Sequence, residues 1–558
     1  MTNAGSIPGS KGGELNPQAL LACVGALGVL GLGAVVWASS HMAVYAALVG
    51  TSGVALFLFS LRREFRQDMA ARALLGTFLT PIVAWVLPHV LLLFLVMCFW
   101  VPAMAGRRDR IAGVYLCCML LLPALDVPIA IGSLKLVAFN VQDGLVLGSA
   151  FAIARNPVRH PGRFIADRWV IALLVLFTVV FGRDTSSTNL LRVACSVVLN
   201  LGLPYYVLSR GIANATELRT TIRWFACGGV ALAALMLFEA VRAWSLYNEL
   251  YQHYGLPNMF YLKVRGGIVR AAGPFMESTS AALVLALSLA GMWLLRADFR
   301  SRLRHYALAA VMFLGMSVPQ SRGAWMGVLV GWLLVDLYRR DYAALARRCM
   351  VMGLLAAVVL ALASLSPTFA NAVGFSPGSA DTAEYRKQLF QRGMEQIRLR
   401  PFTGYSMPQL DVVMADMRQG EGIVDYVNSF IWVALVSGIG GLALFCGSFM
   451  APMIQSWTRC RDWALAQGRD AGAFLFAGLA MLIVMFAFTS FGARPASVTF
   501  AMFGFACALR GIEIRSRTAR EAEPLLPSLA QVAPAAAVPL AETAPRARSR
   551  DQAASISL

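Results

Sequence analysis

The amino-acid sequence predicts an all-α polytopic integral membrane protein, with about 12 to 14 transmembrane helices and a mainly helical cap on one side of the bilayer. Three observations predict this fold. The chain is 58% hydrophobic and only 14% charged, apolar runs of roughly 18 residues or more recur along it, and clusters of Lys and Arg separate many of these runs. A soluble chain of 558 residues needs less apolar surface than this.

The net charge of +19 arises mainly from basic loops between the apolar runs. Such loops set the topology of a membrane protein by the positive-inside rule, so the charge does not indicate binding to nucleic acid. Nearly all of the ten cysteines lie in apolar runs, and no Cys and His spacing typical of a zinc site is present. We therefore expect no disulfide framework, no metal site and no cofactor.

The N-terminal part is predicted to be a transmembrane bundle of residues 18–223, preceded by a cytoplasmic segment of residues 1–17. No cleavage-site pattern follows the first apolar run, so this run is expected to remain as a span. Basic clusters flank the proline-interrupted stretch Ala73–Ala105 on both sides, which favours two short spans or a re-entrant hairpin. The other predicted spans lie near Ala19–Trp37, Met42–Leu61, Ile111–Leu122, Leu136–Ala154, Trp169–Phe181 and Leu190–Leu208.

The C-terminal part is predicted to be a second transmembrane domain, residues 224–510, with long outer loops at 242–275 and 366–426. Within the second loop, Ala383–Arg398 has the pattern of an amphipathic helix and Pro401–Gly404 that of a turn. The tail, residues 511–558, is rich in Ala, Pro, Arg and Glu and is expected to be a disordered cytoplasmic segment. Two predicted helices flank Arg322, and the other spans lie near Trp224–Val241, Ser280–Leu295, Met350–Leu365, Ser429–Phe449, Ala471–Phe488 and Val498–Leu509.

Four arginines lie on the outer side in this topology: Arg265, Arg270, Arg322 and Arg494. The positive-inside rule disfavours them there, and a charge at the end of a span is costly unless it serves something. A guanidinium grips a phosphate or diphosphate through paired hydrogen bonds, so an anionic partner in the outer leaflet explains these residues. The alternative is an ordinary interfacial anchor whose charged head snorkels to water.

Three stretches of the second domain resemble the O-antigen ligase and Wzy-type polysaccharide polymerase superfamily. The first is Val269–Glu277, where an arginine and Gly-Pro-Phe precede a span, and the second is Ser-Arg-Gly-Ala at Ser321–Ala324. The third is the loop 366–426, which contains Tyr-Arg in its helix, then Pro-Phe-Thr-Gly-Tyr, and closes with Asp-Tyr-Val-Asn-Ser at Asp425–Ser429. The resemblance covers roughly Trp224 to Leu509.

One position departs from the pattern of this superfamily. Its ligases usually have a His-Asn pair at the end of the large loop, and that histidine is thought to help activate the acceptor hydroxyl. Here Val427 precedes Asn428, and valine cannot take a proton. The chain is therefore more similar to the exopolysaccharide polymerase-like members than to the lipopolysaccharide ligases.

The resemblance implies a metal-independent glycosyl transfer under a periplasmic cap, at the bacterial inner membrane. A hydroxyl of a growing glycan acceptor attacks the anomeric carbon of an oligosaccharide on polyprenyl diphosphate, and polyprenyl diphosphate leaves. Arginines aimed at the developing negative charge are the expected catalytic device, and we expect Arg270 and Arg322 to fill this role. Glu277 and Asp425 are the candidates for the base that takes the hydroxyl proton; otherwise each is a solvated loop charge or a helix cap.

Further residues are expected to contact glycan or phosphate: Arg265, Tyr385, Arg386 and Arg494. Asn428 either holds a sugar hydroxyl or caps the helix that follows it. Glu421 and His253 are weaker candidates for the base.

Polymerisation of an exopolysaccharide or O-antigen is the leading hypothesis. The alternatives are a ligase that joins a glycan to lipid A core or to a protein, a polysaccharide transporter, and an assembly scaffold. Acidic and basic pairs inside spans are typical of transporters, whereas few spans here carry a mid-span charge, and Asp143 alone does not build an ion pathway. Expected partners are the polyprenyl-diphosphate-linked oligosaccharide, the glycan acceptor, the lipid bilayer, and a chain-length regulator and flippase of the same pathway.

Overall fold

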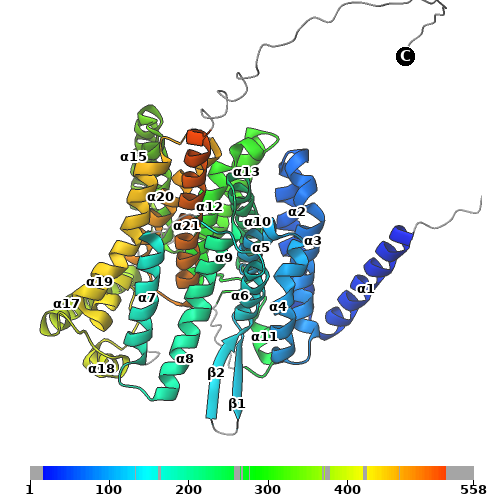
Figure 1. Ribbon diagram of the computed structural model, residues 1–558. Coiled ribbons are helices and arrows are strands. Elements are labelled where there is room, and N and C mark those ends of the chain that lie inside the picture. The colour runs from blue at the N-terminus through cyan, green and yellow to red at the C-terminus, as the bar shows by residue number, and fades with distance from the viewer. Residues whose placement is uncertain are drawn as a thin grey trace, which may run out of the picture. The chain divides into compact units, whose positions relative to one another are not determined.

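The computed structural model describes residues 17–522, with the exception of 132–133, 161–164, 257–263, 266–267, 276, 367–369, 371–376, 419–423 and 464–465 (Figure 1). The chain divides into two compact units, Met1–Glu513 and Ile514–Leu558. The predicted tail lies mostly outside the described residues, and residues 511–522 continue the last helix. Within the described ranges the structure is almost entirely helical, so the predicted all-α class is confirmed.

The helices that precede the central helix, α10, cover roughly the first two fifths of the chain. They are α1 (Pro17–Ser39), α2 (His41–Ser60), α3 (Arg63–Val86), α4 (Val90–Ala105), α5 (Ile111–Cys118), α6 (Val141–Ala154), α7 (Ile165–Gly182), α8 (Ser187–Val197) and α9 (Leu203–Gly211). The central helix and those after it are α10 (Ala215–Arg242), α11 (Asn248–His253), α12 (Ser278–Leu294), α13 (Arg302–Ser317), α14 (Arg322–Arg339), α15 (Tyr342–Leu365), α17 (Pro377–Leu399), α18 (Met407–Val413), α19 (Ser429–Gln455), α20 (Ala466–Phe486) and α21 (Ala493–Ala522).

Eight helices of the described part are long and apolar enough to cross a membrane, or up to nine if the sharply bent pair Val90–Ala105 and Arg108–Cys118 forms one span. This number lies below the 12 to 14 that the sequence predicts. Several predicted spans form shorter apolar helices, among them α6 and α12. The protein is a multi-pass membrane protein in which full spans and shorter helices pack together.

Two segments of the N-terminal part show how local signals set the helix ends. The stretch Ala73–Ala105 belongs to two helices, α3 and α4, with a break at residues 87–89, and both predictions, two short spans or a re-entrant hairpin, include such a break. The predicted span Leu136–Ala154 instead begins with strand β2 (Leu134–Asn140), which pairs with strand β1 (Asp126–Ile131). Helix α6 begins only at Val141, because Asn140 and Asp143 form a capping box at its first turn.

Helix α10 lies at the centre of the bundle and packs against α2, α5, α12 and α13. Near its beginning, Arg219 and Arg223 both bind the buried carboxylate of Asp298, at 2.7 and 2.8 Å. Its last turn carries a second buried carboxylate, Glu239, which is 3% exposed. The helix therefore links an ionic cluster at one end of the bundle to a polar contact at the other.

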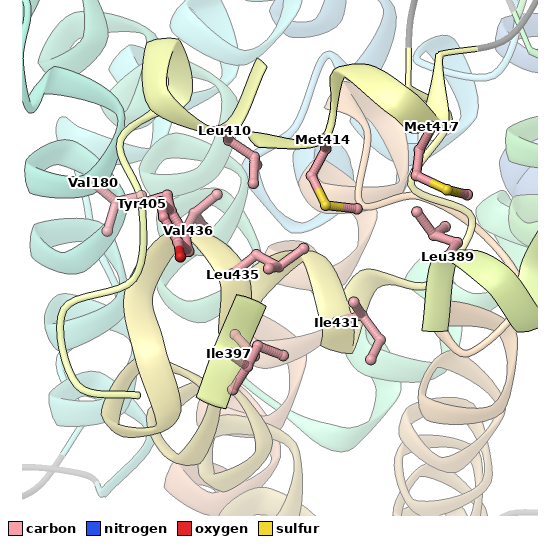
Figure 2. Packing of buried hydrophobic residues seen from close by; sticks show 11 residues of the cluster. Val180, Leu389, Ile397, Tyr405, Leu410, Met414, Met417, Ile431, Leu435 and Val436 are labelled. Atoms are coloured by element: carbon pink, nitrogen blue, oxygen red, sulfur yellow. The ribbon is translucent and has the colours of Figure 1, made fainter. Parts of the chain in front are cut away.

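Helix α19 is broken at Gly438, whose backbone has φ 69° and ψ −174°. The half before the break packs against α17 and α18 in one apolar cluster. Figure 2 shows Leu410, Met414 and Met417 on one side of Ile431 and Leu435, with Ile397 of α17 on the other side. The expected amphipathic helix Ala383–Arg398 lies within α17, and together with α18 it forms a helical cap over this half-helix.

Candidate functional site

Strands β3 (Val264–Arg265) and β4 (Ile268–Val269) form a short antiparallel pair. The first contact of the candidate site joins the loop after β4 to the turn between α13 and α14. The Nε of Arg270 donates a hydrogen bond of 2.7 Å to the carbonyl oxygen of Pro319. The next residue of the turn, Gln320, has φ +54°, which is uncommon for a residue with a side chain. Helix α14 then begins at Arg322, whose side chain is exposed. The structure thus brings Arg270 to the turn that presents Arg322.

The loop that carries Arg270 is held in place by Glu239 of α10. The Glu239 carboxylate accepts backbone N–H bonds from Gly273 at 2.8 Å and Ala272 at 3.3 Å, and a third from Leu246 at 2.9 Å. Gly273 has φ +57°, so the loop turns in the left-handed region where glycine costs least. A buried carboxylate needs such donors to offset its desolvation, and here two of the three come from the loop itself.

Arg494 supports the same loop from the start of α21. Its side chain is buried, its Nη2 donates to the Leu122 carbonyl at 2.5 Å, and its guanidinium lies over the Phe275 ring at 4.2 Å. Its Nη1 is buried without a hydrogen-bond partner among the described residues. Arg494 therefore packs, as a buried side chain, against Phe275 in the loop that carries Arg270.

Residues 121–124, which follow α5, provide backbone carbonyls that bind side chains near this loop. The Leu122 carbonyl also accepts from Gln142 Nε2 at 2.7 Å, while the hydroxyl of Tyr247 donates to the Leu121 carbonyl at 3.2 Å and that of Tyr251 to the Ala124 carbonyl at 2.8 Å. Backbone carbonyls freed at a helix end inside a membrane protein need such donors. Burial raises the pKa of both tyrosines, so they stay protonated donors.

The turn between α20 and α21 connects this region to the cap. A Cβ added at Gly323 would lie 2.9 Å from the Cβ of Phe488, so α14 begins in close contact with this turn. The Thr489 carbonyl accepts from the Ser429 hydroxyl at 2.6 Å. We call the part of the bundle formed by residues 269–275, 318–323, 428–429 and 487–494 the arginine end.

The motif at the start of α19 serves the helix directly. The Oδ1 of Asn428 accepts from the backbone N–H groups of Phe430 and Ile431, at 3.0 and 3.2 Å. The sequence predicts either a helix cap or a sugar contact for Asn428, and the helix cap is present. The Nδ2 group of Asn428 takes no part in the cap. Val427 packs against the apolar cluster of the cap.

Tyr385 and Asp425 meet at the edge of the cap. The Tyr385 hydroxyl donates to the Asp425 carbonyl at 3.2 Å and to the Met417 carbonyl at 3.4 Å. Burial, and then the nearby Asp425 charge, raise the pKa of Tyr385. The Asp425 side chain is exposed, so its carboxylate is accessible from solvent.

The remaining candidates are placed as follows. Glu277 is exposed just before α12, and its Oε2 accepts from the Ser280 hydroxyl at 3.1 Å. Arg386 is half-buried beside Tyr385. His253 Nε2 lies 3.1 Å from the Leu87 carbonyl, whereas the side chain of Arg265 and all of Glu421 lie outside the described residues. Among the residues that the structure describes, no three His, Cys, Asp or Glu side chains gather as metal ligands.

Two residues with central contacts are absent from the sequence prediction. Glu239 could have been found, because a carboxylate near the end of an apolar helix is costly and usually functional. Arg183, after α7, donates to the carbonyls of Thr403 at 2.7 Å and Val436 at 3.4 Å. Nothing in the sequence indicates this contact, since more than 200 residues separate the partners.

Comparison with known families gives one match. Residues 307–446 match the model of the O-antigen ligase family. The matched range includes Arg322, Tyr385, Arg386, Asp425 and Asn428, and it ends within α19. A comparison with curated proteins gives no match.

Proposed function

We propose, from the match of residues 307–446 to the O-antigen ligase family model, that the chain polymerises oligosaccharide repeats carried on polyprenyl diphosphate. The family implies an enzyme of the glycosyltransferase type, acting as a ligase or a polymerase. The product in this proposal is an exopolysaccharide or O-antigen, made at the periplasmic face of a bacterial inner membrane. The observation that carries the proposal is the contact between Arg270 and the turn that presents Arg322.

The proposed reaction needs one nucleophile, one leaving group and one base. The oxygen of an acceptor hydroxyl forms a bond to the anomeric carbon, and the bond from that carbon to the diphosphate oxygen breaks. The electron pair leaves with the diphosphate, whose charge Arg270 and Arg322 neutralise. Removing one such preorganised donor typically lowers a rate by about 10² to 10³. This step needs no metal and no nucleotide sugar.

The acceptor proton passes to a carboxylate in this proposal. Glu277 and Asp425 are both exposed, as a group that meets an incoming glycan must be. Glu277 shares the loop of Arg270, whereas Asp425 lies at the cap beside Tyr385. Glycan contacts are assigned to Tyr385 and Arg386 at the cap.

The buried position of Arg494 gives it a supporting function in the proposal. It lies under Phe275 and beside the Leu122 carbonyl, so it acts on the diphosphate through the position of the loop. Arg265 completes the set of arginines on this loop and is proposed to contact the incoming carrier.

Ligation is the second candidate, because the matched family is that of the O-antigen ligases. A ligase of this kind would join the finished glycan to lipid A core or to a protein. Val427 favours the polymerase, since its side chain packs in the cap and has no proton to exchange. A chain-length regulator and a flippase of the same pathway are the proposed partners of the polymerase.

The test is complementation of a deletion strain at matched expression, with the glycan sized on gels and its carrier identified. We expect the deletion to accumulate single lipid-linked repeats, and wild type to restore long polymer. Arg270→Ala and Arg322→Ala should both fail to restore it, while Arg302→Ala should succeed, because Arg302 is exposed at the start of α13, away from the arginine end. Long polymer that persists in the deletion strain without attachment to lipid or protein would replace the polymerase with the ligase. Full restoration by both arginine variants would refute the site.

A further inference from the structure

The break in α19 at Gly438 separates a first half, which packs in the cap, from a second half long enough to cross a membrane. The half after the break continues from Ile439 through the π-helical turn Ser456–Cys460, about 22 residues or roughly 33 Å at 1.5 Å per residue. This length is close to the roughly 30 Å hydrocarbon thickness of a bilayer. At its far end, Arg461 donates to the carbonyls of Leu337 and Tyr338. Gly438 therefore lies about one hydrocarbon thickness away from Arg461 along the helix.

A second helix ends at the same level as this break. Helix α7 finishes at Gly182, and the guanidinium of the next residue, Arg183, binds the carbonyls of Thr403 and Val436. Thr403 lies in the turn 401–405, and Val436 lies two residues before the break at Gly438. Helix α7 therefore ends at the level where α19 is broken.

The turn 401–405 is fixed directly at this level. The Ile439 N–H donates to the Pro401 carbonyl at 2.7 Å, and the Tyr405 N–H donates to the Leu435 carbonyl at 2.7 Å. A Cβ at Gly438 would lie 2.4 Å from the Phe402 carbonyl oxygen. The backbone of the turn is thus held against the break in α19.

The side chains at this level are large, apolar and exposed. Phe402 is 83% exposed, Leu399 is 70% exposed and Ile439 is 50% exposed. Arg398 and Arg400 beside them are also exposed. Apolar and aromatic groups flanked by cations are the composition of a segment lying in the headgroup region. Such groups are costly in water and match the lipid expected at this depth.

We propose that Leu399, Phe402 and Ile439 form a lipid anchor of the cap, which inserts into the boundary between headgroups and acyl chains in the leaflet at the arginine end. The anchor joins the end of α17 to the start of the spanning half of α19, so it fixes the height of the cap above the bilayer. It depends on the placement of the membrane and not on the reaction proposed above.

The test measures the depth of a fluorescent probe on the full chain in vesicles of phosphatidylethanolamine and phosphatidylglycerol. An environment-sensitive dye is attached to Phe402→Cys, with Leu399→Cys as a second site. Ala415→Cys is the matched control, since it is exposed in the short helix Ala415–Met417 of the cap. The parent chain labelled in the same way is the blank, because Cys349 is exposed.

We expect quenching of the 402 and 399 probes by lipids that carry a shallow spin label to exceed that of the 415 probe by about twofold or more, as for groups buried about 5 to 10 Å into the interface. Iodide in the water should quench the 415 probe more strongly than the other two. Strong iodide quenching at 402 and 399 would overturn the proposal, because these side chains would then face water, or a protein that is missing from the vesicles.

Discussion

Arg270 and Pro319 are joined by a hydrogen bond of 2.7 Å from Nε to the carbonyl oxygen. This bond spans 49 positions of sequence and connects the loop held by Glu239 to the turn that begins α14. The Nε bond holds the guanidinium of Arg270 against this turn. The turn therefore orients one arginine while it presents the other.

This relationship predicts that Arg270 and Arg322 act as one unit. We expect Arg270→Ala and Arg322→Ala each to lower glycan transfer by about 10² to 10³, and the double variant to fall well short of the product of the two losses. Arg270→Lys keeps the charge but loses the planar donor to Pro319, so it should restore little. The measurement is initial-rate transfer in proteoliposomes with a lipid-linked donor. Losses that multiply fully would show that the two arginines serve independent steps.

Glu239 is predicted to position the loop of Arg270. The variant Glu239→Gln turns an amide N–H₂ toward backbone N–H groups, and loss of charge-assisted bonds of this kind costs about 1.5 to 3 kcal/mol each. We expect faster tryptic cleavage at Arg270 and at least tenfold slower transfer. The matched control is Glu249→Gln on α11, where the carboxylate accepts from the Ser40 hydroxyl at 2.6 Å and does not touch the loop. If cleavage at Arg270 were unchanged in Glu239→Gln, the positioning role would be excluded.

Gly438 and Gly440 offer a paired test of the broken helix. A methyl group at Gly438 would collide with the Phe402 carbonyl at 2.4 Å in a left-handed backbone, whereas nothing lies within 4 Å of a methyl group at Gly440. Gly438→Ala should therefore lower the free energy of unfolding by about 2 to 4 kcal/mol. Gly440→Ala should leave it unchanged or raise it by up to about 1 kcal/mol. Thermal unfolding in detergent measures both, and equal midpoints would contradict the clash.

The sequence predicts the parts of the fold that depend on local pattern. The apolar runs identify most helices, the positions around Asp425–Ser429 mark the start of α19, and the turn at Pro401–Gly404 is present with Gly404 at φ +59°. Strand β2 is not predicted, because most of its residues are as apolar as those of a span, and only the cap at Asn140 separates strand from helix. The described residues contain fewer long apolar helices than the 12 to 14 predicted spans for a related reason: hydropathy does not distinguish a full-length span from a shorter apolar helix such as α6 or α12.

The site shows the same division between local and long-range information. Arg270 and Arg322 stand out in the sequence because charge at a span end is costly. Other features of the site depend on contacts between distant segments, which no local pattern encodes. These features are the turn that Arg270 and Arg322 share, the bonds of the Glu239 carboxylate and the buried position of Arg494. The cap residue Asn428 lies between these cases, since its motif predicts either a helix cap or a sugar ligand.

Asn428 therefore allows a variant that separates structure from recognition. Its Oδ1 caps α19, and its Nδ2 is the group that would donate to a sugar hydroxyl, the other role that the sequence predicts. Asn428→Ala removes both groups and should cost about 1 kcal/mol of stability together with transfer activity. Asn428→Asp keeps the capping oxygen and removes the donor, so it should retain the unfolding midpoint while raising the KM for the lipid-linked glycan. Unfolding in detergent and transfer kinetics in proteoliposomes measure the two effects separately. An aspartate variant with wild-type kinetics would show that Asn428 acts on the helix alone, because the capping oxygen would then be the only group of this side chain that the reaction needs.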